Sequence, residues 1–198
     1  MKTKLLAILI VSLALLSCRN NKGNALSENG ISDSSSVKSD SLIADSRGYI
    51  VKVGDMAPDF EIEYIGGKKI MLSSLKGKLV MLQFTASWCG VCRKEMPFIE
   101  SVIWLKNKKN PKFILLGIDF KETPDVTAKF AADMKITYPV TLDTAGTKFA
   151  LFCGPDAGVT RNIIIDKDGK IVLLTRLFEE AEFNGMVKFI NEELNKMK

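Results

Sequence analysis

Two cysteines separated by two residues, Cys89 and Cys92, are the side chains of this sequence best suited to chemistry. They lie between an apolar run of strand length and a run with helical spacing, so the first thiol is predicted at a helix N-terminus. Backbone amides and the helix dipole stabilise a thiolate there. The second thiol, one turn later, would be close enough to attack a mixed disulfide formed by the first. We therefore predict Cys89 as the nucleophile and Cys92 as the resolving thiol.

The absence of histidine and the positions of the other two cysteines exclude several kinds of catalytic and metal site. The chain has 198 residues, four cysteines and no histidine, which excludes Ser-His and Cys-His catalytic pairs and metal sites with histidine ligands. A structural zinc site would need two more thiolates, and only the separated Cys18 and Cys153 remain. We expect no metal, and no cofactor beyond a Cys89–Cys92 disulfide. The alternative is that both cysteines are buried and inert, which is common for cysteines in protein cores. Their position between a strand and a helix argues against this alternative.

The N-terminal residues predict export. Lys2 and Lys4 precede an apolar run that is shorter than the roughly 20 residues of a transmembrane helix, so residues 1–17 fit a secretory signal peptide. The segment Leu15-Leu16-Ser17-Cys18 resembles the signal of bacterial lipoproteins, which implies cleavage before Cys18 and a lipid anchor on it. A cysteine that follows an ordinary signal peptide by chance is the alternative. Serine-rich residues 18–48 are expected to form a flexible tether.

The net charge gives no sign of nucleic-acid binding. It is +5 for the whole chain, and only +3 once Lys2 and Lys4 of the predicted signal peptide are set aside. An excess this small does not predict a nucleic-acid partner.

Residues 49–198 have the pattern of one α/β domain. The expected elements are a hairpin of Glu61–Ile65 and Lys68–Leu72 around Gly66-Gly67, buried strands Leu79–Phe84, Phe113–Ile118 and Pro139–Leu142, helices Val91–Leu105 and Pro124–Met134, a second hairpin of Asn162–Ile165 and Lys170–Leu174, and a C-terminal helix around Phe183–Leu194. Pro97 is expected to kink the first helix. A βαβ unit followed by a ββα unit predicts a thioredoxin-like fold, a central mixed sheet flanked by helices, with an added N-terminal β-hairpin.

Five motifs resemble those of the TlpA/ResA-type thiol-disulfide oxidoreductases, membrane-anchored and periplasm-facing members of the thioredoxin superfamily. They are Ala57–Phe60, Leu75–Lys78, Val80–Phe84, Trp88–Pro97 and Asp166–Lys170. The resemblance implies that Trp88, Gly90 and Val91 support the cysteine pair. It also implies that Glu95 assists proton transfer or substrate recognition, although an ordinary carboxylate on the helix surface is the alternative.

The same resemblance implies partners and a location. The partners would be disulfide-containing exported proteins, with a membrane thiol transporter as the electron donor. The chain would be a lipoprotein of the cell envelope, facing the periplasm and anchored in the inner or outer membrane.

One position departs from the family's pattern. Thioredoxin-like proteins usually carry a cis-proline before the strand that faces the cysteine pair, and alignment of Ile163–Asp166 places Thr160 there. A cis bond before threonine costs roughly 3 kcal/mol, so the bond is either trans or held by local contacts. We expect Thr160 to support the active site and to alter how substrates are handled. Cys153, in the preceding loop, is either a buried core thiol or a third redox group.

These observations predict a thiol-disulfide oxidoreductase that reduces disulfides in exported proteins. Gly90-Val91 carries none of the charge associated with the strongest oxidants, so we expect a potential near that of thioredoxin and below about −150 mV. A thiol-dependent peroxidase is one alternative, because Ala57–Phe60 also occurs in peroxiredoxins. Those enzymes, however, carry threonine or serine where this chain has Ala86. A non-enzymatic binding module is the other alternative, left open by Thr160.

Overall fold

The computed structural model describes residues 47–197. The predicted signal peptide (1–17), the predicted lipid anchor Cys18 and residues 19–46 of the predicted tether lie outside the described residues.

Two residues that the sequence assigns to the tether contact the domain. Arg47 donates from Nη1 to the carbonyl of Leu174 at 2.9 Å, and the N–H of Gly154 donates to the carbonyl of Gly48 at 3.0 Å. The described fold thus includes both residues.

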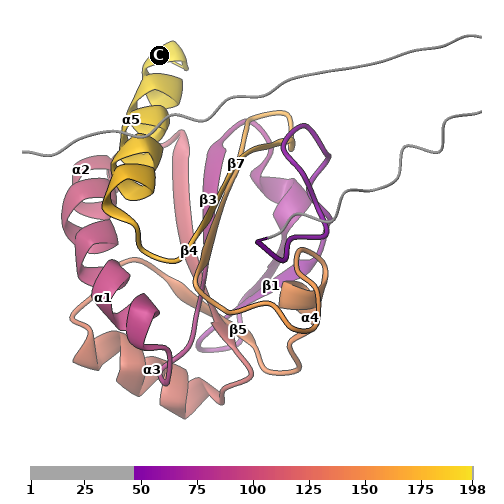
Figure 1. The fold of residues 1–198 in the computed structure, drawn as a ribbon, viewed down its shortest axis with the longest axis vertical. Helices are drawn as coiled ribbons and strands as arrows, with labels where there is room; N and C mark the ends of the chain where they lie inside the picture. Colours follow the sequence, from indigo (N-terminus) through magenta and orange to yellow (C-terminus); the bar gives the residue numbers. More distant parts are fainter. Residues whose placement is uncertain (1–46, 198) are drawn as a thin grey trace, which may run out of the picture. The chain divides into compact units, whose positions relative to one another are not determined.

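A mixed sheet of seven strands forms the centre of the described part of the chain (Figure 1), in the order β2-β1-β5-β4-β3-β6-β7. The strands are β1 (Glu61–Tyr64), β2 (Lys69–Met71), β3 (Leu79–Thr85), β4 (Phe113–Phe120), β5 (Val140–Asp143), β6 (Arg161–Ile165) and β7 (Ile171–Arg176). Strands β3, β4 and β5 are parallel, and the other pairings are antiparallel. This arrangement confirms the thioredoxin-like α/β fold.

The added N-terminal hairpin is also confirmed. Strands β1 and β2 pair around Gly66 and Gly67, whose φ angles of 95° and 88° are the positive values that a tight hairpin turn requires. Strand β1 then pairs with β5, so the hairpin extends the sheet at one edge.

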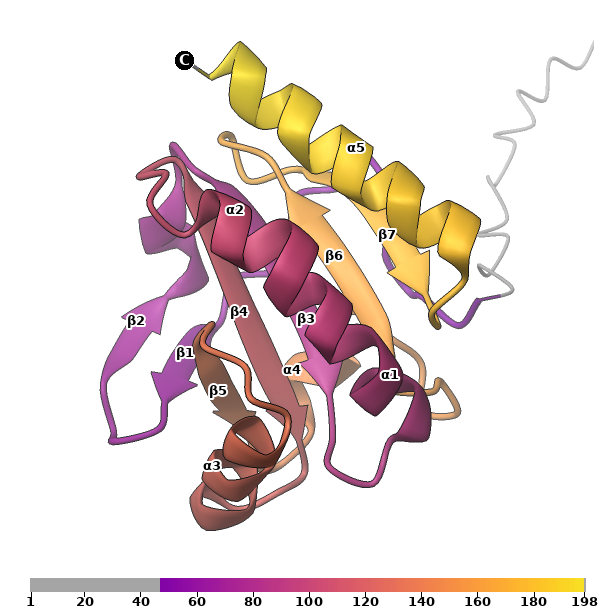
Figure 2. The ribbon, with the colours of Figure 1, turned by 90° about the vertical axis from the view of Figure 1, so that its left-hand side faces the viewer.

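Helices cover the two faces of the sheet unequally (Figure 2). Helices α1 (Gly90–Phe98), α2 (Leu105–Asn107), α3 (Pro124–Asp133) and α5 (Glu180–Lys196) lie on one face. The short α4 (Thr147–Ala150), the 3₁₀ turn η1 (Leu72–Leu75) and the segment before β1 lie on the other. Each face has its own cluster of buried apolar side chains, so the sheet is covered on both sides.

The helix that begins at the cysteine pair changes its hydrogen-bond pattern after Pro97. Helix α1 passes into a π-helical segment, η2 (Ile99–Trp104), and then into α2. Proline has no N–H to continue the α-helical pattern, and the N–H of Ile99 is shared between the carbonyls of Glu95 and Met96. π-Helical turns often occur near functional sites. Glu95 lies in α1, about one turn before the π-helical segment begins.

Strand β3 is buried along its whole length and leads into the cysteine pair. It pairs in parallel with β4 and antiparallel with β6, and both of its faces are covered. A strand in this position needs apolar side chains on both faces, which explains the continuous run Leu79–Phe84. Since neighbours fix β3 on both sides, its end at Thr85 is a rigid base for residues 86–89.

The core beneath β3 can be tested at Phe84. Its ring packs edge-on against Phe149, with centroids 5.3 Å apart, and lies 5.8 Å from the ring of Phe152. We expect Phe84→Ala to lower the free energy of unfolding by about 3–5 kcal/mol in urea denaturation with the disulfide intact. Phe98→Ala, at a half-exposed position, is the control and should cost clearly less. Equal losses would contradict this description of the core.

Candidate active site

Cys89 and Cys92 are joined by a disulfide at the start of α1, with their Cα atoms 5.3 Å apart. Cys89 is the residue that precedes the helix, and its Sγ accepts a hydrogen bond of 3.2 Å from the N–H of Cys92. The sulfur thus takes the place of a helix-capping acceptor, at the end of the helix that favours negative charge. Cys92 is fully buried, whereas Cys89 is 9% exposed. Of the two, Cys89 is the one that a partner can reach.

Thr160 lies against both sulfurs. Its Oγ1 is 3.1 Å from Sγ of Cys89 and 3.2 Å from Sγ of Cys92. The residue immediately precedes β6, so β3 and β6 together bring the loop and the helix start into contact. Proline, the usual residue at this position in the family that the sequence resembles, has no side-chain hydroxyl and could not make these contacts.

Glu95 is buried, with only 1% of its surface exposed, so its interpretation as a helix-surface carboxylate is wrong. Its Oε1 accepts a hydrogen bond of 2.6 Å from Nδ2 of Asn162, and its Oε2 accepts one of 3.3 Å from Nε2 of Gln83. The hydroxyl of Tyr138 donates to Oε1 of Gln83 at 2.7 Å, and Nδ2 of Asn162 also donates to Oγ1 of Thr175 at 3.0 Å. Helix α1 is therefore joined to the sheet by a buried polar network.

This environment changes the acidity of Glu95. Burial raises the pKa of its carboxyl to about 7, although the hydrogen bonds from Asn162 and Gln83 oppose the rise. The negative charge of Glu182 adds slightly to it. A carboxyl of this kind can take up or release a proton near neutral pH, unlike an exposed glutamate.

The spacing of the residues explains how the site is assembled. Thr160 and Asn162 are two residues apart, so the alternation of an extended chain directs both side chains towards α1. Cys92 and Glu95 are three residues apart in the helix, which places them on the same face. The two pairs meet: Thr160 contacts the sulfurs and Asn162 contacts Glu95.

The comparisons with known proteins agree with this arrangement. A family model described as Redoxin matches residues 52–190. The chain belongs to the Redoxin family. The resemblance of its motifs to those of thiol-disulfide oxidoreductases of the thioredoxin superfamily is confirmed by its relatives.

One relative is the thiol-disulfide oxidoreductase ResA of Bacillus cereus, 36% identical over 124 residues, which are 62% of this chain and 68% of the relative. Among solved structures, a putative protein disulfide isomerase from Bacteroides thetaiotaomicron has a TM-score of 0.72 and 57% identity, covering 75% of this chain and 93% of the other. A putative thiol:disulfide interchange protein DsbE from Chlorobium tepidum has a TM-score of 0.64 and 28% identity, covering 73% and 99%.

Three of the predicted supporting residues of this Redoxin-family site are neighbours of Cys89 in the chain, whereas Thr160 is buried. Trp88 precedes Cys89 and is 64% exposed. Gly90 and Val91 form the first turn of α1, and a Cβ added at Gly90 would meet no atom within 4 Å. The surface beside Cys89 is therefore uncharged and partly apolar.

The carboxyl group of Glu122 holds the loop before Cys89, and a second carboxyl group, that of Asp119, is buried nearby in sequence. Glu122 accepts hydrogen bonds from the N–H of Ser87 at 2.7 Å and from its Oγ at 2.5 Å. Asp119, at the end of β4, is fully buried, and burial is the main reason that its pKa is raised, with the charge of Glu122 adding to the effect. The sequence did not lead to a prediction of a role for Glu122 or Asp119. The one indication in the sequence was Asp119 itself, a charged residue near the end of a predicted buried strand.

Cys153 fits the interpretation as a buried core thiol. It is free and buried, and burial raises the pKa of its thiol to about 12. It is therefore protonated, and a poor nucleophile, at neutral pH.

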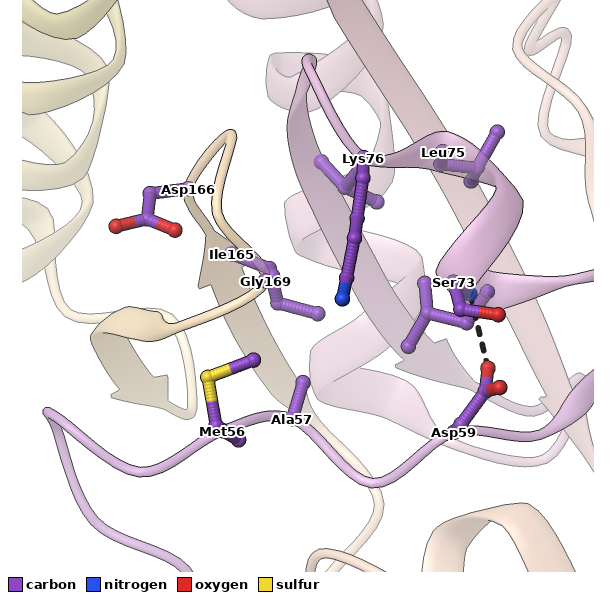
Figure 3. Close-up of a pocket in the computed structure, with 11 residues that line it drawn as sticks. Met56, Ala57, Asp59, Ser73, Leu75, Lys76, Ile165, Asp166 and Gly169 are labelled. Atoms are coloured by element: carbon purple, nitrogen blue, oxygen red, sulfur yellow. Dashed lines mark hydrogen bonds between the residues drawn. The ribbon is translucent and has the colours of Figure 1, made fainter.

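The remaining motifs of the Redoxin domain meet at the opposite end of β3 (Figure 3). They line a cavity of about 190 Å³, into which Lys76 extends from above, with Met56 and Ala57 on the other side. The N–H of Ser73 donates to Oδ1 of Asp59 at 2.8 Å, and the N–H of Ala57 to the carbonyl of Gly169 at 2.9 Å. These motifs hold the segment before β1 against the sheet.

Two further properties concern only the part of the chain that the structure describes. Within residues 47–197, no three cysteine, aspartate or glutamate side chains gather in a way that could hold a metal ion. None of the helices in this range is long and apolar enough to cross a membrane.

The raised pKa of Glu95 makes stability depend on pH. Between about pH 4.5 and pH 7 the unfolded chain loses the glutamate proton while the folded domain retains it, so stability falls as pH rises. The difference between the two pKa values corresponds to roughly 3 kcal/mol. In the unchanged chain, urea denaturation should show the free energy of unfolding decrease between these pH values. We expect Glu95→Gln to make this decrease smaller by about the same amount. The decrease that remains would come from Asp119, whose pKa is also raised.

Glu192→Gln, at an exposed position of α5, is the control for this measurement and should retain the pH dependence of the unchanged chain. A Glu95→Gln variant that kept the full pH dependence would contradict the account of Glu95.

Proposed function

We propose that this thiol-disulfide oxidoreductase is a reductase that passes two electrons from its Cys89 and Cys92 thiols to disulfides in exported proteins. The observation that supports this best is the cysteine pair itself, because the sulfur of Cys89, the more exposed residue, caps a helix and Thr160 contacts both sulfurs. No cofactor beyond this pair is part of the proposal.

The proposed reaction has two exchanges. The Cys89 thiolate attacks one sulfur of the partner's disulfide, which forms a mixed disulfide and releases the partner's first thiolate. The Cys92 sulfur, after loss of its proton, then attacks Sγ of Cys89. This step closes the Cys89–Cys92 disulfide and releases the partner's second thiolate. Each thiolate released takes up a proton, so the partner gains two electrons and two protons.

Two neighbours would serve this reaction. The Thr160 hydroxyl would donate a hydrogen bond to the Cys89 thiolate and stabilise it. Glu95, with a pKa near neutrality, would accept the proton that Cys92 must lose. Glu95 lies one helical turn beyond Cys92, on the same face of α1.

The proposed setting is the cell envelope. A signal peptide over residues 1–17, a lipid on Cys18 and a tether up to residue 46 would hold the domain near a membrane, facing the periplasm. A membrane thiol transporter would return the enzyme to its dithiol form. This part of the proposal is supported by the sequence pattern and by the resemblance to membrane-anchored oxidoreductases.

Peroxide reduction is the competing enzymatic activity. The residue three positions before Cys89 is Ala86, a fully buried side chain without a hydroxyl, where peroxiredoxins have threonine or serine. Rapid peroxide consumption by the reduced protein would favour the peroxidase over the reductase.

The roles of the two cysteines can be separated by mutation. We expect Cys89→Ser to abolish reduction of insulin disulfides, since the nucleophile is lost. Cys92→Ser should accumulate mixed disulfides with exported proteins, visible on non-reducing gels, because the second exchange cannot occur. Cys153→Ser is the control and should retain activity. Full activity of Cys89→Ser would disprove its assignment as nucleophile, and the absence of any trapped partner would favour a binding module.

The contribution of Thr160 can be measured in the reduced protein. A hydrogen bond to a charged group contributes about 1.5–3 kcal/mol, so Thr160→Val should raise the pKa of the Cys89 thiol by about 1 to 2. The ultraviolet absorbance of the thiolate, followed against pH, gives this value. Thr160→Ser keeps the hydroxyl and should restore it. An unchanged pKa in Thr160→Val would mean that the hydroxyl does not stabilise the thiolate.

A further inference from the structure

Arg161 follows Thr160 and has no counter-charge. It is fully buried, and its Nε and Nη2 donate to the carbonyls of Gly158 and Arg47 at 2.8 and 2.5 Å. Its Nη1 is buried without a hydrogen-bond partner, and within residues 47–197 no carboxylate forms an ion pair with it. The Tyr49 ring lies 4.5 Å from the guanidinium carbon, which is favourable but does not neutralise the charge. Buried charges are normally paired, so this arginine lacks a partner that it needs.

A second arginine lies directly beside it. Arg161 and Arg176 are cross-strand partners in the β6–β7 pairing, so their like charges are neighbours on one face of the sheet. Like charges in this position repel each other. Arg176 also has a buried Nε without a hydrogen-bond partner. Two adjacent cations with unused donors form a site that favours an anion.

These two side chains line an open pocket of about 290 Å³ beside the loop that leads to Thr160. Arg47 also lines it and pairs with Glu182, Nη1 to Oε1, at 3.6 Å. Asp156 is the one carboxylate among the pocket's lining residues in the described chain. Because Glu182 pairs with Arg47, the guanidinium groups of Arg161 and Arg176 face one carboxylate, and the lining is positively charged. The volume is at the small end of ligand pockets, which suits a single acidic group.

We propose that this pocket binds an oxyanion, either a carboxylate or an inorganic phosphate, through Arg161 and Arg176. An oxyanion there would be attracted by the two guanidinium charges, and planar guanidinium groups match the geometry of such anions. It would also relieve the repulsion between the two arginines. Aliphatic alcohols and cations of the same size would not bind.

Arg161 is next to Thr160 in sequence, but its side chain lies on the other face of β6. The alternation of an extended strand turns Arg161 away from the face on which Asn162 contacts Glu95. Gly158, whose carbonyl accepts the Nε hydrogen bond, is two residues before Thr160. The loop that carries Thr160 therefore forms one wall of the pocket.

Binding can be measured without reference to redox activity. The purified, oxidised protein is titrated with sodium phosphate and, separately, sodium acetate, at an ionic strength kept constant with sodium chloride. Backbone amide shifts of Gly154 and Gly158 and the Nε resonances of the arginines are followed by NMR. We expect saturable shifts confined to the pocket, with a Kd of about 10 mM or tighter.

Arginine variants test whether the anion binds in this pocket. Arg176→Gln should weaken binding at least about tenfold, because a charge-assisted hydrogen bond contributes about 1.5–3 kcal/mol. Arg93→Gln removes the same charge outside the pocket and should leave the Kd unchanged. Arg161→Gln is measured as well if it folds, since Arg161 is fully buried. The test depends on Arg176→Gln, because Arg176 is only partly buried and its substitution should disturb the fold less.

A further arm identifies the source of the oxyanion. A short peptide containing glutamate is compared with the same peptide containing glutamine. Preference for the glutamate peptide over phosphate assigns the pocket to a protein carboxylate, and the reverse order assigns it to inorganic phosphate. Either order supports the proposal. The absence of saturable shifts with every anion, or equal affinities for Arg176→Gln and the unchanged chain, would overturn it.

Discussion

The structure of the active site depends on the contact between the Thr160 hydroxyl and the two sulfurs. This contact joins the start of α1 to the loop before β6, and it exists because β3 and β6 pair along their whole shared length. One layer deeper, the hydrogen bond between Asn162 and Glu95 joins the same two elements. The position of the cysteines, the burial of Glu95 and the direction of Arg161 all follow from the register of β6.

The proposed hydrogen bond from Thr160 would change the reduction potential of the cysteine pair only slightly. A hydrogen bond that stabilises the reduced thiolate makes a pair more oxidising, and about 1.5–3 kcal/mol corresponds to roughly 30–60 mV for a two-electron couple. Added to a potential near that of thioredoxin, about −270 mV, this shift leaves the pair well below about −150 mV. Stabilisation of the thiolate by Thr160 is thus compatible with a reductase. The uncharged Gly90-Val91 turn supplies no larger effect.

The sequence predicted the elements better than the contacts between them. Periodicity and turn residues were sufficient for the hairpin at Gly66-Gly67, the buried strand β3 and the helix at Cys89, because these patterns are local. The buried network around Glu95 could not be predicted in this way, since its partners come from three strands or loops far apart in the chain. Gln83 gave a weak signal as the polar residue in an apolar run. Nothing local indicated that Arg161 would be fully buried.

The measurement that tests the central claim most directly is the reduction potential of the Cys89–Cys92 couple at neutral pH. The protein is equilibrated with dithiothreitol or glutathione buffers of known ratio, and its thiols are then alkylated and counted. We expect a value below about −150 mV, towards that of thioredoxin. A value above about −150 mV would contradict it, because the pair would then be poised to oxidise its partners.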